Sequence, residues 1–475
     1  MARQVLIVHG WSDTSASFHA LARFLTAHGF ATQMLWLGDY ISMDDDVRVQ
    51  DVAIRMAEVI DERIKSSVLQ PGFDMIVHST GGLVARAWLT TRYRGAPDKC
   101  PVKRLVMLAP ANYGSRLAAI GKSMLGRLVK GFRNGFHTGT SMLNDLELSS
   151  AFQWELAQRD VLIAPGGDDT RYYGGDRVWP FVIVGTRGYT GFLRQIANEN
   201  GSDGTVRACA ANLNARGVTI DFRETDPVKM IQPWASRMQS DAPLAVLPTR
   251  THGSIIDPDR ADPGNQDEFV ETGDEKAQLG TLILEALNCA SFAAYGDIRS
   301  RWDAISEQTA ARHTDADNPH ADEFHQYMQL NAYVVDDHGK PVPDYFLEFF
   351  SNPDNADDAA NVYLHANVIE DVKKNSQNDG LRNLYFDRTD LVEGYYPRLP
   401  AGTKPVLYMT ISAEAPGANI YYFAQDNPTA AGKVPVRPEE DATKHWLRHN
   451  STLFVQIIIP RRPVDDVFRL TQFQG

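Results

Sequence analysis

Cysteine is scarce in this chain of 475 residues. Its three cysteines, Cys100, Cys209 and Cys289, are odd in number and far apart, which argues against a disulfide framework or a cysteine metal cluster. Basic residues are outnumbered as well, since 47 Lys and Arg stand against 60 Asp and Glu, for a net charge of −13. Phosphate backbones require concentrated positive charge, so we expect no nucleic-acid partner.

Long apolar runs are also missing. After one early basic residue, Arg3, the first apolar run covers only residues 5–8, which is too short for the hydrophobic part of a signal peptide. No segment approaches the roughly 18 uninterrupted apolar residues of a membrane span. We therefore expect a protein made in soluble form, either cytoplasmic or exported by a route without a cleaved N-terminal signal peptide.

The sequence pattern changes once along the chain, which predicts two domains. Short β-rich runs alternate with helical patterns up to about Cys289, which is typical of a mainly parallel sheet with helices on both faces. Beyond about Glu323, aromatic-rich strands alternate with Gly, Pro, Asn and Asp turns, which favours an antiparallel β-sandwich. We predict an α/β domain over residues 1–313, with an insertion at about 113–178, and a β-sandwich over 320–475. The clearest strands are expected at 5–9, 32–37, 74–78, 103–108, 181–185 and 244–247, and then at 330–335, 345–350, 406–411 and 453–459.

Two acidic segments stand out along the chain. We expect the acidic run 44–46 to favour the positive end of the helix that follows rather than to bind a metal. That helix has Val52, Met56, Val59 and Ile60 on one stripe. An acidic loop contains Asp354, Asp357 and Asp358. Such a loop can hold calcium but is more often solvated, and we expect no metal.

Ser79 stands where an apolar run, 73–78, stops and two glycines, Gly81 and Gly82, open a helical pattern. This layout is typical of a nucleophile elbow, a tight strand-to-helix turn that exposes a serine hydroxyl. The usual G-x-S-x-G pattern has glycine where this chain has Val77. A serine at this place can also be an ordinary helix cap, so the pentapeptide alone leaves both interpretations open.

Two later loops provide an acid and a base in the order that such a serine needs. Asp203 lies among glycines in the loop 200–206, and His252 follows the last strand expected in the α/β domain. We hypothesise that Asp203 orients His252 and that His252 takes the proton of the serine. Asp176 and Asp221 are alternatives for the acid, although both are placed less well relative to the strands.

Two backbone N–H groups are candidates for stabilising a developing oxyanion. The first expected strand ends in His9-Gly10-Trp11, where the glycine permits a sharp turn that leaves the N–H of Trp11 free. The N–H of Thr80, the residue after the serine, is the second candidate. A plain turn at the end of a strand is the alternative interpretation of the first segment.

Taken together, these segments resemble the α/β-hydrolase family, and within it the lipase-like and esterase-like serine hydrolases. The resemblance covers roughly residues 1–290 and leaves the carboxy-terminal half outside it. It implies a catalytic triad of Ser79, His252 and Asp203, an acyl-enzyme intermediate and water as the acyl acceptor. The segments that carry it are 9–11, 78–82, 108–115, 202–206 and the loop around His252.

The insertion offers a hint about the substrate. Residues 115–133 contain five basic and no acidic side chains, with apolar residues at helical spacing, which indicates a cationic amphipathic helix. Such a helix can lie on an anionic lipid surface, or it can be a lid packed on the sheet with solvated charges. The basic residues are Arg116, Lys122, Arg127, Lys130 and Arg133.

We therefore expect a serine carboxylic ester hydrolase of the lipase or phospholipase type that cleaves lipid esters. Small-ester hydrolysis and amide hydrolysis are alternatives, because the same triad serves both bonds. A further alternative is a binding or delivery protein whose β-sandwich carries the function. We expect no cofactor, and the sequence does not specify a partner protein for the carboxy-terminal domain.

Overall fold

The structure is a computed structural model in which the chain forms two compact units, each described separately below. The first unit contains Met1–Ala215, Ser236–Tyr327 and His449–Thr452, and the remaining chain forms the second. The residues that the structure describes are 3–120, 139–189, 198–224, 227–259, 273–315, 318, 320–351, 358–402, 407–422, 434–436 and 446–473.

The two units are not contiguous in sequence, which differs from domains at 1–313 and 320–475. Residues Arg216–Ala235 belong to the second unit, and His449–Thr452 belong to the first. The physical reason for the first exchange is a strand pairing: β7 (Arg216–Asp221) runs parallel to β18 (Ser451–Ile459), with Leu453 opposite Arg216.

A parallel six-stranded sheet organises the first unit, in the order β10-β6-β4-β3-β1-β2. Every residue of β3 and β6 is buried, which explains why these strands are continuous apolar runs rather than alternating ones. All six strands expected in this part of the chain are present. Their bounds are β1 (Val5–Val8), β2 (Leu35–Gly38), β3 (Phe73–His78), β4 (Val102–Leu108), β6 (Trp179–Gly185) and β10 (Leu244–Leu247).

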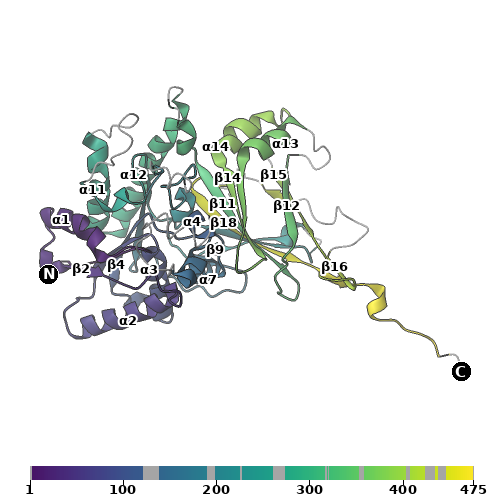
Figure 1. Cartoon of the computed structure of the whole chain (residues 1–475), viewed down its shortest axis with the longest axis horizontal. Helices are drawn as coiled ribbons and strands as arrows, with labels where there is room; N and C mark the ends of the chain where they lie inside the picture. Colours follow the sequence, from purple (N-terminus) through teal and green to yellow (C-terminus); the bar gives the residue numbers. More distant parts are fainter. Residues whose placement is uncertain are drawn as a thin grey trace. The chain divides into compact units, whose positions relative to one another are not determined.

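Helices cover both faces of this sheet (Figure 1). Helices α11 (Gly273–Asn288) and α12 (Phe292–Ala310) lie on one side, and α2 (Val49–Lys65) and α3 (Gly81–Arg92) lie on the other. The strands β3, β1 and β2 are neighbours in that order. Because the crossover connections between them are right-handed, α1 (His19–Ala27) lies on the face of the sheet opposite to α2. Among the described residues, no helix combines the length and the apolar character needed to cross a membrane.

The first unit also contains short helices and strands outside the six-stranded sheet. They are α4 (Arg116–Ile120), α6 (Thr140–Leu146), α7 (Ala151–Asp160), α9 (Ala208–Ala211), β5 (Leu162–Ile163) and β9 (Ala235–Ser236), of which β9 straddles the unit boundary. Of the helix expected at 115–133, the structure describes only the first residues as α4, and the remainder lies outside the described residues.

The second unit has a mixed six-stranded sheet, in the order β13-β14-β11-β18-β7-β8, and a three-stranded antiparallel sheet, β12-β15-β17. Buried apolar side chains from both sheets form one core. The expected additional β structure is present, but the larger sheet is mixed because β7 enters it parallel to β18. The remaining bounds are β8 (Ile231–Pro233), β11 (Tyr327–Asp336), β12 (Tyr345–Phe350), β13 (Ile369–Lys374), β14 (Leu381–Asp387), β15 (Leu407–Ala413), β16 (Ile420–Tyr422), β17 (Val434–Val436), β19 (Arg461–Pro463) and α10 (Pro227–Met230).

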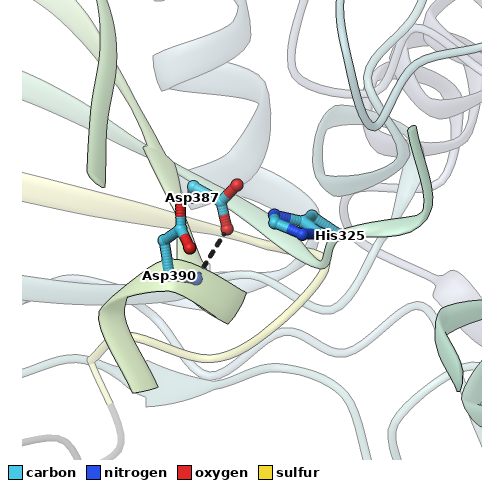
Figure 2. A group of neighbouring side chains, drawn as sticks. All are labelled: His325, Asp387 and Asp390. Carbon is cyan, nitrogen blue, oxygen red and sulfur yellow. Dashed lines mark hydrogen bonds between the residues drawn. The ribbon is translucent and has the colours of Figure 1, made fainter. Parts of the chain in front are cut away.

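Two short helices of the second unit begin at aspartate caps. The Asp358 carboxylate accepts a hydrogen bond from the Asn361 N–H at 2.7 Å, at the start of α13 (Ala359–Tyr363). The Asp387 carboxylate accepts one from the Asp390 N–H at 2.9 Å, at the start of α14 (Arg388–Asp390; Figure 2). Each carboxylate therefore satisfies a backbone donor that the helix leaves open. Asp354 and Asp357 of the acidic loop lie outside the described residues.

Candidate active site

Ser79 occupies a strained turn between β3 and α3. Its φ angle is +54°, a left-handed conformation that is uncommon for a residue with a side chain. The turn is held by hydrogen bonds from the Ser79 N–H to the Leu108 carbonyl at 3.1 Å and from the Ala111 N–H to the Ser79 carbonyl at 3.2 Å. The elbow therefore forms in this chain although Val77, a fully buried residue of β3, stands where the usual pattern has glycine.

Two glycines let the neighbouring backbone approach this turn closely. A Cβ atom placed on Gly10 would lie 2.7 Å from the Cβ of Ser79, and one placed on Gly81 would lie 2.8 Å from the His9 carbonyl oxygen. Such distances are far shorter than ordinary contacts, so a side chain at either position would displace the turn. The loop after β1 and the start of α3 thus fix the serine between them.

The three side chains proposed from sequence meet at this turn. His252 Nε2 lies 3.0 Å from Ser79 Oγ, and His252 Nδ1 lies 2.8 Å from Asp203 Oδ2. Asp203 is fully buried, and His252 and Ser79 are each 8% exposed. Because a carboxylate only accepts, Nδ1 donates to Asp203 and Nε2 is left to accept the serine hydroxyl proton. This tautomer is the one that a general base requires.

The loop that carries Asp203 orients its carboxylate. Asp203 Oδ1 accepts hydrogen bonds from the Thr205 N–H at 3.0 Å and the Val206 N–H at 2.7 Å. Gly204 has a φ of +88°, a conformation that glycine adopts without strain. One carboxylate oxygen is therefore tied to the loop, and the other faces His252.

The alternative acids occupy other places. Asp221 ends β7 and forms an ion pair with Arg223 at 2.5 Å. Asp176 lies exposed in the turn before β6.

His78 is a functional candidate that the sequence analysis passed over. Its side chain is buried, and its Nε2 lies 3.0 Å from the His252 carbonyl oxygen, with the two imidazole rings 4.6 Å apart. Nε2 must carry the proton, because a carbonyl only accepts. The His252 N–H in turn donates to the Asp203 carbonyl at 2.9 Å. The backbone of His252 is thus held on both sides.

His78 is kept neutral by its surroundings. Burial, followed by the repulsion of His252, lowers its pKa well below the usual range for histidine. Within the described residues, its Nδ1 is buried and makes no hydrogen bond. A proton there would be costly, so His78 remains a hydrogen-bond donor to the loop rather than a second cation beside His252. The sequence signal was its place directly before Ser79, although its partner lies 174 positions away.

The two N–H groups proposed for an oxyanion lie at the same turn. The Trp11 N–H donates to the Thr80 hydroxyl oxygen at 3.3 Å, so an oxygen atom already occupies the acceptor position of this donor. Thr80 precedes the first residue of α3, where backbone N–H groups have no partner inside the helix. The loop itself is braced by His9, whose Nδ1 lies 2.7 Å from the Gly10 carbonyl and whose ring stacks on Tyr40 at 4.3 Å.

A buried ion pair fixes α3 behind the serine. The guanidinium of Arg86 binds both carboxylate oxygens of Asp160, at 2.7 and 2.9 Å, and both side chains are fully buried. Tyr173 donates a third hydrogen bond to Asp160 at 2.9 Å, and Arg86 also binds the Asn112 carbonyl at 2.8 Å. Such a pair is costly to break from one side only, so it holds α3 and α7 in register.

Arg116 is the basic residue of the 115–133 stripe whose side chain the structure describes. It lies 3.7 Å from Glu199, which also pairs with Arg207 at 2.7 Å. The positive charge of Arg116 is thus partly compensated within the first unit.

Comparisons with known proteins agree with this fold. Residues 5–262 match the model of the alpha/beta hydrolase family. Among solved structures, the phospholipase PlaB from Legionella pneumophila is 25% identical, with a TM-score of 0.75 over 99% of this chain and 96% of that one. The same phospholipase in complex with thio-NAD is 24% identical, with a TM-score of 0.77 and the same coverage. The mature lipase BlEst2 from Bacillus licheniformis reaches a TM-score of only 0.36, at 16% identity over 54% of this chain and 87% of that one. No curated protein sequence matches.

Proposed function

Because the chain belongs to the alpha/beta hydrolase family, we propose that it is a serine hydrolase that cleaves carboxylic esters of lipids. The observation that carries the proposal is the continuous hydrogen-bonded line from Asp203 through His252 to Ser79, with steps of 2.8 and 3.0 Å. The left-handed backbone of a buried serine costs folding free energy. Nucleophilic catalysis explains why such a serine is held next to an imidazole and a carboxylate.

The proposed reaction has two halves. His252 Nε2 takes the Ser79 hydroxyl proton while Oγ attacks the ester carbonyl carbon, and the imidazolium then returns that proton to the leaving alcohol as the acyl-enzyme forms. Water, deprotonated by the same imidazole, attacks the acyl-enzyme and releases the carboxylic acid. Asp203 stays ionised throughout and stabilises the imidazolium.

The backbone N–H groups of Trp11 and Thr80 are proposed to bind the oxyanion. The Thr80 hydroxyl oxygen, which accepts from the Trp11 N–H at 3.3 Å, stands where a substrate oxygen would compete for that donor. Turning the Thr80 side chain away would free the Trp11 N–H for the oxyanion. Each such donor contributes about 10²- to 10³-fold to the rate in acyl-transfer enzymes.

Lipid esters, and phospholipids in particular, are the substrate class that we propose. Support comes from the similarity to a phospholipase that extends over 99% of this chain at 25% identity, well beyond the hydrolase core. We also propose peripheral contact with lipid through residues 115–133, a segment that contains five basic residues and no acidic ones. Cleavage of small soluble esters or amides is the alternative for the same triad.

The deciding experiment compares the wild type with Ser79→Ala on phosphatidylcholine vesicles and on nitrophenyl esters of increasing chain length. We expect release of fatty acid by the wild type and a loss of at least about 10³-fold in the variant, with unchanged circular dichroism. Matched nitroanilides test amide cleavage.

The outcomes separate the alternatives. A rate confined to short soluble esters would replace lipids by small esters as substrates. Faster cleavage of anilides than esters would make the protein an amidase. An inactive wild type, or an active and folded Ser79→Ala, would leave the non-catalytic binding protein as the better interpretation.

A further inference from the structure

An apolar groove lies in the first unit between β2, the edge strand of the sheet, and helix α2. Its volume is about 670 Å³, and it is lined from β1, β2, the segment after β2, and nearly the whole length of α2. None of the residues that line it belongs to the triad. Cavities of this size typically hold one small ligand.

The walls of the groove are only partly covered. Val52 and Ile60 are buried, at 8% and 3% exposure, but Met56 and Val59 of the same helical stripe are half-buried, as are Leu6 and Trp36 opposite them. Apolar side chains that line a concave, half-covered channel favour the entry of an apolar chain.

Two side chains that line the groove contain buried polar atoms. Trp36 Nε1 and Tyr40 Oη are buried and have no hydrogen-bond partner within the described residues. The indole is only a donor, and burial, followed by the charge of Asp13, raises the pKa of Tyr40 so that its phenol keeps its proton. An unsatisfied buried donor is costly, and a ligand carboxylate at the Trp36 end would relieve that cost for the indole once the ring turned toward it.

Charge is unevenly distributed along the rim. Arg55 pairs with Glu58 at 2.6 Å, but Arg63, which also lines the groove, is exposed and makes no ion pair with any described residue. The acidic residues that line the groove are Asp39 and Asp51. Because α2 returns antiparallel to β2 in a parallel sheet, Arg63 lies toward the Trp36 end and Asp51 toward the Tyr40 end.

We propose that this groove binds one fatty acid of ten or more carbons, with the acyl chain along the stripe of α2 and the carboxylate at Arg63. The choice of a fatty acid rests on the proposed function, since ester hydrolysis releases that acid, but binding itself requires no turnover. Tyr40 stacks on His9, whose ring is bound to the Gly10 carbonyl next to Trp11. The groove thus touches the loop that carries a proposed oxyanion donor.

The test is calorimetric titration of the full-length Ser79→Ala protein with decanoate below its micelle concentration. We expect one saturable site. Val59→Trp fills the groove and should weaken binding at least tenfold, whereas Ile54→Trp, on the exposed outer face of α2, should leave it unchanged. Arg63→Gln should weaken binding about two- to fivefold, as expected for one exposed ion pair, and decanol should bind more weakly than decanoate.

Three results would overturn the proposal. The first is no saturable binding of decanoate, and the second is equal affinity in Val59→Trp and Ile54→Trp when both keep the circular dichroism of the parent. The third is that the parent protein does not bind decanoate and that Val59→Trp has a different oligomeric mass in solution from the parent. That result would make the groove a contact between copies of the chain. Failure of Ser79 to act as a nucleophile would be seen independently, since these titrations use a protein without that serine.

Discussion

The buried carboxylate of Asp145 should change how the free energy of unfolding depends on pH, and the structure determines the sign of this effect. The residue belongs to α6, is only 6% exposed, and its Oδ2 accepts a hydrogen bond from the Val49 N–H at 3.2 Å, at the start of α2. Burial raises its pKa to about 6, although the bond to Val49 and the charge of Arg48 act in the opposite direction. The native state therefore binds a proton at Asp145 more tightly than the unfolded chain does.

The magnitude follows from the difference between the two pKa values. A raised native pKa means that the ionised carboxylate opposes folding above about pH 6, and that this cost disappears below about pH 4, where both states are protonated. The shift of about two units corresponds to about 3 kcal/mol. Asp145→Asn removes the charge and keeps an acceptor for Val49, so we expect a gain of about 1–3 kcal/mol at pH 7.5.

The assay is thermal unfolding of the wild type and Asp145→Asn at several pH values between 4.5 and 8. At about 2–4 °C per kcal/mol, the variant should melt several degrees higher at pH 7.5, and its advantage should shrink steadily toward pH 4.5. Asp51→Asn is the matched control, because Asp51 is exposed and caps the same helix at 2.9 Å from the Arg48 N–H. That variant should lower stability slightly. A less stable Asp145→Asn, or an advantage that does not depend on pH, would refute the reasoning.

Three further predictions concern groups around the nucleophile. Arg86→Met strands the buried Asp160 carboxylate and should cost about 3–5 kcal/mol in chemical unfolding; a cost below about 1 kcal/mol would contradict an ionised pair. His78→Leu should lower kcat by roughly 5- to 150-fold with little change in KM, because the His252 carbonyl loses its donor, and His78→Gln should recover part of the loss; equal rates in both variants would argue against a positioning role. Gly10→Ala places a Cβ 2.7 Å from that of the serine and should lower kcat without large loss of secondary structure, a result checked by kinetics with circular dichroism.

Local patterns were sufficient for much of the first unit. Its six strands could be predicted from sequence because buried parallel strands are short apolar runs, and β10 has the expected bounds, Leu244–Leu247. The chain order of a serine, an aspartate and a histidine also identified the three side chains that the structure brings together.

What the sequence did not reveal depends on pairings between distant residues. The strand β7 was not predicted, and nothing local shows that it pairs with β18, more than 230 positions later. The role of His78 depends on a carbonyl in another loop, and the groove depends on how far α2 stands from the edge strand. In each case the physical cause is a tertiary contact that leaves no periodic signal in the residues themselves.

The central claim is that Ser79 is an activated nucleophile. The most direct measurement is mass spectrometry of the folded protein after treatment with a fluorophosphonate, with the adduct located by peptide mapping. We expect one adduct, on Ser79, whose formation slows strongly in Asp203→Asn because that carboxylate sets the tautomer of His252. An unlabelled Ser79 in the folded wild type, or an adduct on a different serine, would contradict the account.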